Sequence, residues 1–199
     1  MKYDLILADP PWQYRDKNPQ GSAEAHYKTM NTLDIMDLPV VDIAKPDSVL
    51  FMWATFPCMK DALDVMHAWG FKYKTVAFTW IKTNKGRAGE EIEEEDTFFG
   101  IGHYTASNSE ICMIGTRGKG LERVNKDVRQ VIISDREKHS HKPIETFKRI
   151  NRLYGPVSRI ELFATERQPG WDAIGWNLDK RDIREVLDEI IKDEYIDWL

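Results

Sequence analysis

"YDLILADPPW", residues 3–12, sets an apolar run directly before an aspartate, two prolines and a tryptophan. The run at 4–8 has the length and composition of a buried β-strand, with Asp9 at its carboxyl end. Proline has no N–H, and each proline pushes the preceding residue into extended geometry. We therefore expect a core strand that ends in a rigid ledge carrying the Asp9 carboxylate.

Such a ledge offers a carboxylate and an outward carbonyl as fixed hydrogen-bond acceptors. Two acceptors suit an exocyclic amino group, and the face of Trp12 can stack on a flat heterocycle, worth about 1–3 kcal/mol per base. Paired hydrogen bonds would also favour the positive charge that grows on an amino nitrogen during alkylation. From these residues alone a second interpretation stays open, in which a strand meets a Pro-Pro stop and a core tryptophan.

The composition is that of an ordinary globular chain. Its 199 residues are 42% hydrophobic and 31% charged with a net charge of −5, which suits one domain and gives no overall basic nucleic-acid footprint. Cys58 and Cys112 lie in apolar surroundings, as packing residues do in a reducing compartment. The first apolar run is too short for a signal peptide or a membrane span, so we expect a soluble, cytoplasmic protein without membrane contact.

Strands and helices alternate along the chain. This order is typical of an α/β fold with a largely parallel sheet. The segments at 71–82 and 109–118 follow one another without a helix between them, so we expect one antiparallel strand. Strands are predicted at 4–8, 48–53, 71–82, 109–118, 128–134, 158–165 and 170–178, and helices at 57–69 and 143–154.

Parallel sheets bind ligands at the carboxyl ends of their strands. That rule brings Asp9, the segment 53–55, Lys82 and the segment 164–166 to one edge of the molecule. The polar segment 82–102 between two strands is typical of a surface loop.

Five motifs in order resemble one family over nearly the whole chain, residues 2–180. They are "DPPW", "AHYKTM", "FTWIKTN", "HSHKP" and "RIELFATERQPGWDAIGWNLD". Together they resemble the DPPW-type adenine-N(6) methyltransferases, the family of the messenger-RNA adenosine methyltransferase catalytic subunit and of bacterial and phage DNA adenine methyltransferases. The resemblance implies a Rossmann-like fold in permuted motif order, with the catalytic strand ahead of the cofactor strand, and S-adenosyl-L-methionine as methyl donor.

The resemblance also implies roles for individual residues. Asp9 and Pro10 would accept from the adenine amino group, with Pro11 and Trp12 shaping the base pocket. The other substrate-side residues would be Tyr27, Trp53 and Lys82. On the cofactor side it implies Asp9, Lys82, His141, Lys142, Phe163, Ala164, Trp176 and Asn177. The usual glycine-rich loop is absent after the strand "IELFATE", as in other members of this type.

Contacts with nucleic acid would have to come from loops or from a partner, because no separate target-recognition domain is visible. The segment 116–129 carries five basic residues and is the best candidate for binding the phosphate backbone, with Arg117 and Lys119 at its start. A merely solvated loop is the alternative.

The last segment, 181–199, predicts an acidic amphipathic helix beyond a methyltransferase domain at 1–180. Docking on the domain is one interpretation, and a homodimer or partner-subunit contact is the other.

No metal site is expected, because His139 and His141 have no third ligand nearby. The leading hypothesis is therefore an adenine-specific DNA methyltransferase. An RNA adenine methyltransferase and a non-catalytic nucleic-acid-binding subunit are the alternatives, and the intact Asp9–Trp12 motif argues against the second.

Overall fold

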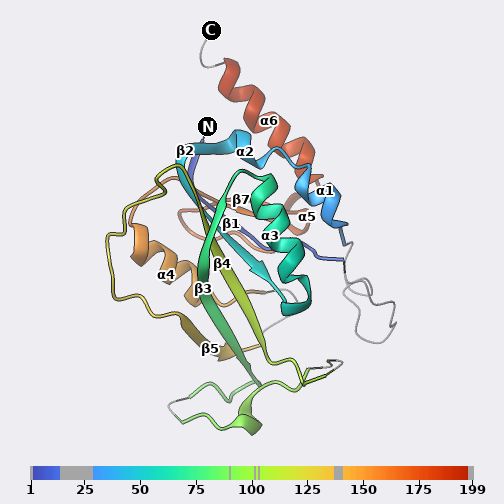
Figure 1. Cartoon of the computed structure of the whole chain (residues 1–199), viewed down its shortest axis with the longest axis vertical. Coiled ribbons are helices and arrows are strands. Elements are labelled where there is room, and N and C mark those ends of the chain that lie inside the picture. Colours follow the sequence, from blue (N-terminus) through green and yellow to red (C-terminus); the bar gives the residue numbers. More distant parts are fainter. Residues whose placement is uncertain are drawn as a thin grey trace.

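The computed structural model describes residues 2–13, 29–89, 91–100, 102, 104–136 and 141–196, with the backbone alone for 194–196. Its centre is a twisted sheet with helices on both faces (Figure 1). In the described part the sheet has seven strands in the order β5-β3-β4-β2-β1-β6-β7. Their bounds are β1 Tyr3–Ala8, β2 Ala44–Ala54, β3 Lys72–Thr83, β4 Ser109–Arg117, β5 Val131–Asp135, β6 Arg159–Leu162 and β7 Asp172–Ile174.

Strand β4 alone among these runs against its neighbours, pairing antiparallel with β2 and β3. The pairs β1–β2, β1–β6, β3–β5 and β6–β7 are parallel. The α/β class and the mixed sheet with one antiparallel strand are thus confirmed, and they are consistent with a Rossmann-like methyltransferase fold.

Strand β1 is covered on both faces. Leu5 and Leu7 enter one core cluster while Ile6 and Ala8 enter the other, and none of the four is more than 1% exposed. A strand buried on both sides reads as a continuous apolar run rather than an alternating one, which is why 4–8 stood out in the sequence. The neighbouring strand β2 repeats the pattern, so these two strands form the centre of the molecule.

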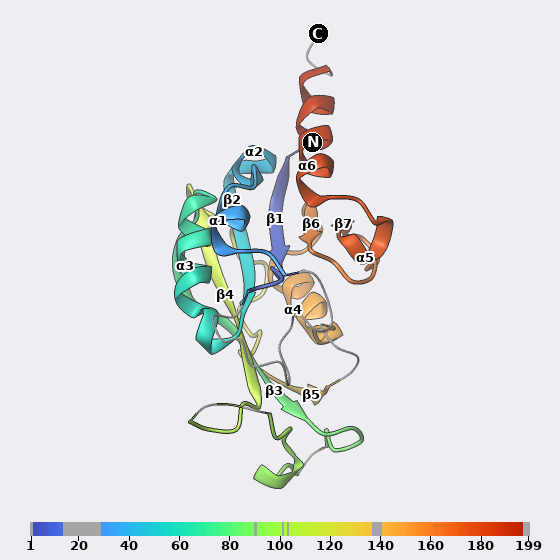
Figure 2. The ribbon, with the colours of Figure 1, turned by 90° about the vertical axis from the view of Figure 1, so that its right-hand side faces the viewer.

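The helices divide between the two faces. One face is covered by α3 and the other by α4 (Figure 2). Buried residues of α1, α2 and α6 join the cluster on the α3 face. The bounds are α1 Thr32–Met36, α2 Val40–Ile43, α3 Met59–Ala68, α4 Ile144–Tyr154, α5 Trp176–Asp179 and α6 Ile183–Ile196, with single 3₁₀ turns at Phe56–Cys58 and Glu94–Asp96. None of the described helices combines the length and apolarity that crossing a bilayer requires.

One local expectation was wrong, and two short helices were not predicted. The strand predicted at 170–178 covers only Asp172–Ile174, because Gly175 lies against Ala164, where an added Cβ would come within 2.0 Å of the Ala164 carbonyl oxygen. The chain then turns into α5. Helices α1 and α2 were not predicted, since five and four residues are too few to show a helical period.

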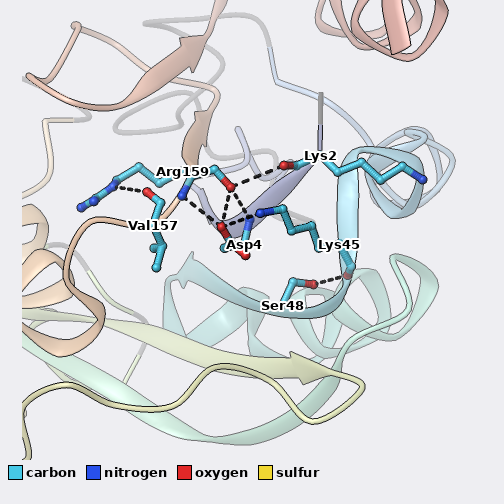
Figure 3. Close-up of polar contacts among 7 residues, drawn as sticks. Lys2, Asp4, Lys45, Ser48, Val157 and Arg159 are labelled. Atoms are coloured by element: carbon cyan, nitrogen blue, oxygen red, sulfur yellow. Dashed lines mark hydrogen bonds and ion pairs between the residues drawn. The ribbon is translucent and has the colours of Figure 1, made fainter. Parts of the chain in front are cut away.

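The amino end of β1 is fastened to both neighbours by the Asp4 carboxylate (Figure 3). Asp4 Oδ2 accepts from Lys45 Nζ at 2.8 Å, at the start of β2, and from Ser158 Oγ at 2.6 Å, just before β6. The Ser158 backbone N–H donates to the same oxygen at 3.1 Å. Burial would raise the pKa of Asp4, but Lys45 and Ser158 outweigh it and lower the pKa. One carboxylate therefore ties three parallel strands at the end opposite Asp9.

We expect Asp4→Ala to lower the free energy of unfolding by about 2–3 kcal/mol, because it leaves Lys45 and Ser158 without their shared acceptor. Urea denaturation measures the change. Asp64→Ala is the matched control, since Asp64 pairs with Lys60 at 2.5 Å on an exposed helix surface. That surface pair should contribute no more than about 0.5 kcal/mol. Equal losses in the two variants would contradict the role assigned to Asp4.

Candidate active site

Four side chains on neighbouring strands meet at the carboxyl edge of the sheet, on the face covered by α4. They are Lys82 of β3, Glu110 of β4, Trp53 of β2 and Asp9 after β1. Side chains alternate along a strand, and each of the four stands an even number of residues from a core residue of the α4 face. Because β4 is antiparallel, its beginning lies at the edge where β2 and β3 end. The expected meeting of Asp9, Trp53 and Lys82 at one edge is therefore what the fold contains.

Lys142, two residues before α4, contacts three of these four side chains. Its Nζ lies 2.6 Å from Asp9 Oδ2 and 3.3 Å from Glu110 Oε2, and 5.7 Å from the centre of the Trp53 ring. Lys82 Nζ lies 2.5 Å from Glu110 Oε1. The result is a chain of alternating charge, Lys82–Glu110–Lys142–Asp9. All four side chains are only 12–17% exposed, so water screens their interactions little.

The two carboxyl groups respond differently to this environment. Burial raises the pKa of Asp9, and the neighbouring Lys142 only partly offsets it. Burial would also raise the pKa of Glu110, but Lys142 and Lys82 outweigh it and lower the pKa. For Lys142 burial acts downward, yet Asp9 and Glu110 together raise its pKa. Glu110 is thus a firm counter-ion, while Asp9 can exchange a proton more readily.

The turn after β1 fixes the position of Asp9. The Trp12 N–H donates to the Pro10 carbonyl at 2.8 Å, and the Met30 N–H donates to the Pro11 carbonyl at 2.9 Å. The Trp12 indole donates to the Trp53 carbonyl at 3.0 Å. Within the described residues, only Oδ2 of the Asp9 carboxylate accepts a hydrogen bond, which leaves Oδ1 directed at no partner there.

Trp12 itself is a core residue, 5% exposed and packed in the cluster on the α3 face. To stack on a base its ring would have to leave that core, so the arrangement does not support the stacking role favoured by the sequence. Trp53 is likewise buried, at 1% exposed. Both tryptophans hold the edge of the sheet together at the site.

A pocket lies beside Asp9, between the end of β6 and the start of α4. It is lined by Asp9, Lys142, Phe147, Glu161, Phe163, Thr165, Glu166 and Gln168. Glu161 of β6 is 8% exposed and has no hydrogen-bond or ion-pair partner in the described part of the chain. Burial raises its pKa to about 8, with Asp9 and Glu166 adding to the effect. A buried carboxyl group without a partner favours a ligand that brings positive charge or hydrogen-bond donors.

Of the residues predicted for the cofactor, Asp9, Lys142 and Phe163 line this pocket, and Ala164 lies between two lining residues. Phe163 lines it with φ at +64°, a conformation uncommon for a residue with a side chain. Ala164 donates its N–H to the Ile174 carbonyl at 2.9 Å, which brings it against the start of the Trp176–Asn177 turn. Trp176 is 61% exposed, an unusual position for a tryptophan without a ligand or partner. His141 precedes Lys142 and is half-buried.

Two predicted substrate contacts lie elsewhere. Arg117 is at the far end of β4, where its guanidinium donates to the carbonyls of Val41 and Ala44 at 2.7 and 3.0 Å. Lys119 follows it, with its N–H bound to the Asp47 carboxylate. The structure therefore does not bring these two residues to Asp9. Tyr27 and His139 lie outside the described residues.

Glu110 and Glu161 were missed by the sequence reasoning. Each is a lone acid in an otherwise apolar strand, in "SEICMIG" and "RIELFA". An acid at an inward position of a buried strand is rare unless it is paired, and this signal could have identified both.

Comparison with known proteins finds one family model and several related sequences that match most of this chain. The family model named MT-A70 matches residues 3–177. A type II methyltransferase, M.MunI of Mycoplasma sp, is 33% identical over 202 residues, covering 91% of this chain and 79% of that protein. The human N(6)-adenosine-methyltransferase catalytic subunit METTL3 is 28% identical over 186 residues, and the Drosophila melanogaster MT-A70-like protein is 29% identical over 193. The chain spans only 28% and 29% of the lengths of these two animal relatives.

The raised pKa of Glu161 makes stability depend on pH with a definite sign. The folded protein holds the proton up to about pH 8, whereas an unfolded glutamate releases it near 4.5, so stability falls as pH rises between these values. We expect Glu161→Gln to remove this loss. Relative to the variant, the unchanged protein should lose a few kcal/mol between pH 6 and pH 9, since one pKa unit corresponds to about 1.4 kcal/mol.

Denaturation at several pH values measures this difference. Glu189→Gln is the control, because Arg181 lowers the pKa of Glu189 and keeps it ionised over the whole range. Its difference from the unchanged protein should stay constant from pH 6 to 9. A constant difference for Glu161→Gln as well would contradict a raised pKa for Glu161.

Proposed function

This chain belongs to the MT-A70 family of methyltransferases, and we propose that it transfers a methyl group from S-adenosyl-L-methionine to the exocyclic amino group of adenine in DNA. The observation that carries the proposal is the Asp9 carboxylate, which Lys142 holds at the sheet edge by one oxygen, with no hydrogen bond to the other from the described residues. Beside it lies a pocket lined by the buried Glu161, which has no hydrogen bond within that same part of the chain.

Asp9 has two tasks in this mechanism. Its free oxygen and the Pro10 carbonyl accept hydrogen bonds from the adenine amino group, which draws the nitrogen lone pair out of the ring and favours the charge of the transition state. The nitrogen would gain the methyl group as the bond between the methyl group and the donor sulfur breaks, which leaves a neutral thioether, and it would give up one proton. A carboxylate whose pKa is raised by burial is suited to receive that proton, and Lys142 keeps the carboxylate oriented.

The pocket fits the proposed methyl donor by charge. When bound, S-adenosyl-L-methionine supplies a methyl group activated by a positively charged sulfur, and it carries an ammonium group and a carboxylate as well. Glu161 is the buried acceptor for its positive charge, and Lys142 is the cation of the pocket lining for its carboxylate, with Lys82 behind it on Glu110. The residues that would hold it further are His141, Phe163, Ala164, Trp176 and Asn177.

DNA is favoured as the polymer by the similarity to the type II methyltransferase M.MunI, which extends over most of both chains. An adenine amino group inside a duplex is hard to reach, so the target base would be flipped out or single-stranded. RNA is the second candidate, because the animal N(6)-adenosine-methyltransferases match 89–96% of this chain. Phosphate contacts through Arg117 or Lys119 would require the substrate to extend to the far end of the sheet.

Matched DNA and RNA oligonucleotides with labelled methyl donor distinguish the two polymers. We expect incorporation into DNA adenine, with RNA methylated more slowly by at least about tenfold, an energy difference of about 1.4 kcal/mol in the transition state. A clear preference for RNA would reverse the choice of polymer. Methyl-donor binding without transfer to either would favour a non-catalytic subunit.

Asp9→Ala should lower the rate of transfer at least about 100-fold, because it removes the acceptor that stabilises the transition-state charge. We expect the dissociation constant of the methyl donor to change by less than about tenfold, since Glu161 and the other pocket residues remain. Calorimetry and the labelled-methyl assay measure the two quantities. Asp64→Ala should behave as the unchanged protein. Donor affinity that falls as steeply as activity would place Asp9 chiefly in the donor site.

A further inference from the structure

Glu110 occupies the middle of the charge chain and has no part in the mechanism above. Its two oxygens are divided between two lysines, with Oε1 2.5 Å from Lys82 Nζ and Oε2 3.3 Å from Lys142 Nζ. The side chain is 13% exposed and lies on β4, a strand that carries no other group of the proposed mechanism. Burying a carboxylate costs desolvation free energy, which is offset only when its cationic partners are well placed, as the two lysines are here.

The position of Lys142 depends on a balance between two acids. Its ammonium group lies closer to Asp9, at 2.6 Å, than to Glu110, at 3.3 Å, and the face of Trp53 lies beneath it. An ammonium group has three hydrogens, which these three neighbours can share. Pulled from both sides, Lys142 engages one oxygen of Asp9 rather than both.

We propose that Glu110 is a positioning residue for methyl transfer, which holds Lys142 to one oxygen of Asp9 and so keeps the other oxygen open for the adenine amino group. The proposal rests on the proposed function, because it assigns Glu110 to the same site. Glu110 does not touch the reacting atoms. It acts through Lys142, and Lys82 fixes it in turn.

The charge count shows what Glu110 contributes. With it, two lysines face two carboxylates and the chain is neutral. Without its charge, Lys82 and Lys142 would share the single carboxylate of Asp9, and their mutual repulsion would press Lys142 onto both Asp9 oxygens. The substrate amino group would then compete with an ammonium ion for its acceptor. The loss should therefore appear in catalysis and in substrate affinity, with the methyl-donor pocket around Glu161 unchanged.

The test is a cycle of Glu110→Gln, Lys142→Met and the double variant, assayed with adenine-containing DNA and labelled donor. Glu110→Gln keeps the size and hydrogen bonds of the side chain but removes its charge. We expect kcat/KM to fall about 10- to 100-fold, the usual cost of misplacing a catalytic group. Added to Lys142→Met, the same change should cost less than about threefold, because Glu110 acts through Lys142. Glu110→Asp, which retains the charge, should recover part of the loss.

A pH profile separates positioning from a merely structural role. Among the described residues, the charged or titratable groups around Lys142 are Asp9, Glu110, Lys82, Glu161 and the thiol of Cys112. Losing one of its two acidic partners lowers the pKa of Lys142, so the alkaline limb of kcat should move to lower pH in Glu110→Gln and stay in place in Glu110→Asp. Glu189→Gln, which removes an equal charge from a surface pair, should change neither limb nor rate.

Each outcome decides a separate point. Full activity of Glu110→Gln, or losses that simply multiply in the double variant, would overturn the role of Glu110 while leaving the proposed function intact. An unshifted alkaline limb with a lower melting temperature would make Glu110 structural. An unchanged protein that methylates no adenine substrate would overturn the proposed function and this role with it.

Discussion

The site depends on the Lys142 ammonium group, which lies between the carboxylates of Asp9 and Glu110. Without it Glu110 would keep only Lys82 as a cation, and Asp9, left without its partner, would be driven by burial toward the neutral form. With the Lys142 ammonium group in place, buried charges can be held beside the position where the proposed methyl transfer takes place. The contact also joins parts of the molecule that are distant in sequence, since Asp9 ends the first strand and Lys142 precedes α4.

Two features of the sheet bring this contact about: side chains alternate between the two faces along each strand, and β4 runs antiparallel to its neighbours. Alternation directs Asp9, Trp53, Lys82 and Glu110 to the face beneath α4. The reversal of β4 brings the beginning of that strand to the edge where the others end, so an acid from an early strand position stands among residues from late positions. A fully parallel sheet would carry the same acid to the opposite end.

Much of this could be predicted from residue order, and the rest fails for physical reasons. The sheet, its antiparallel member and the edge position of Asp9 and Lys82 follow from apolar runs and from a missing crossover helix. Glu110 was overlooked because its place in the site depends on which strands pair with β4. The order of strands in a sheet cannot be inferred from the local sequence of one strand. Glu161 depends in the same way on the pocket around it. The stacking role predicted for Trp12 is not supported, because an aromatic residue beside a binding motif gives the same sequence pattern whether its ring faces a ligand or the core.

Strand β1 carries an acid at each end, and the Asp4 clamp gives this a consequence for how the site could be tuned. The strand is short and hydrogen-bonded along both edges, so the Asp4 contacts support the same register that brings Asp9 beside Trp53. A change at Asp4, Lys45 or Ser158 would therefore weaken the support of that register from the end opposite Asp9, without touching any residue of the site. A comparison of related sequences that seeks the cause of different rates should therefore include the amino end of β1 as well as the residues around Asp9.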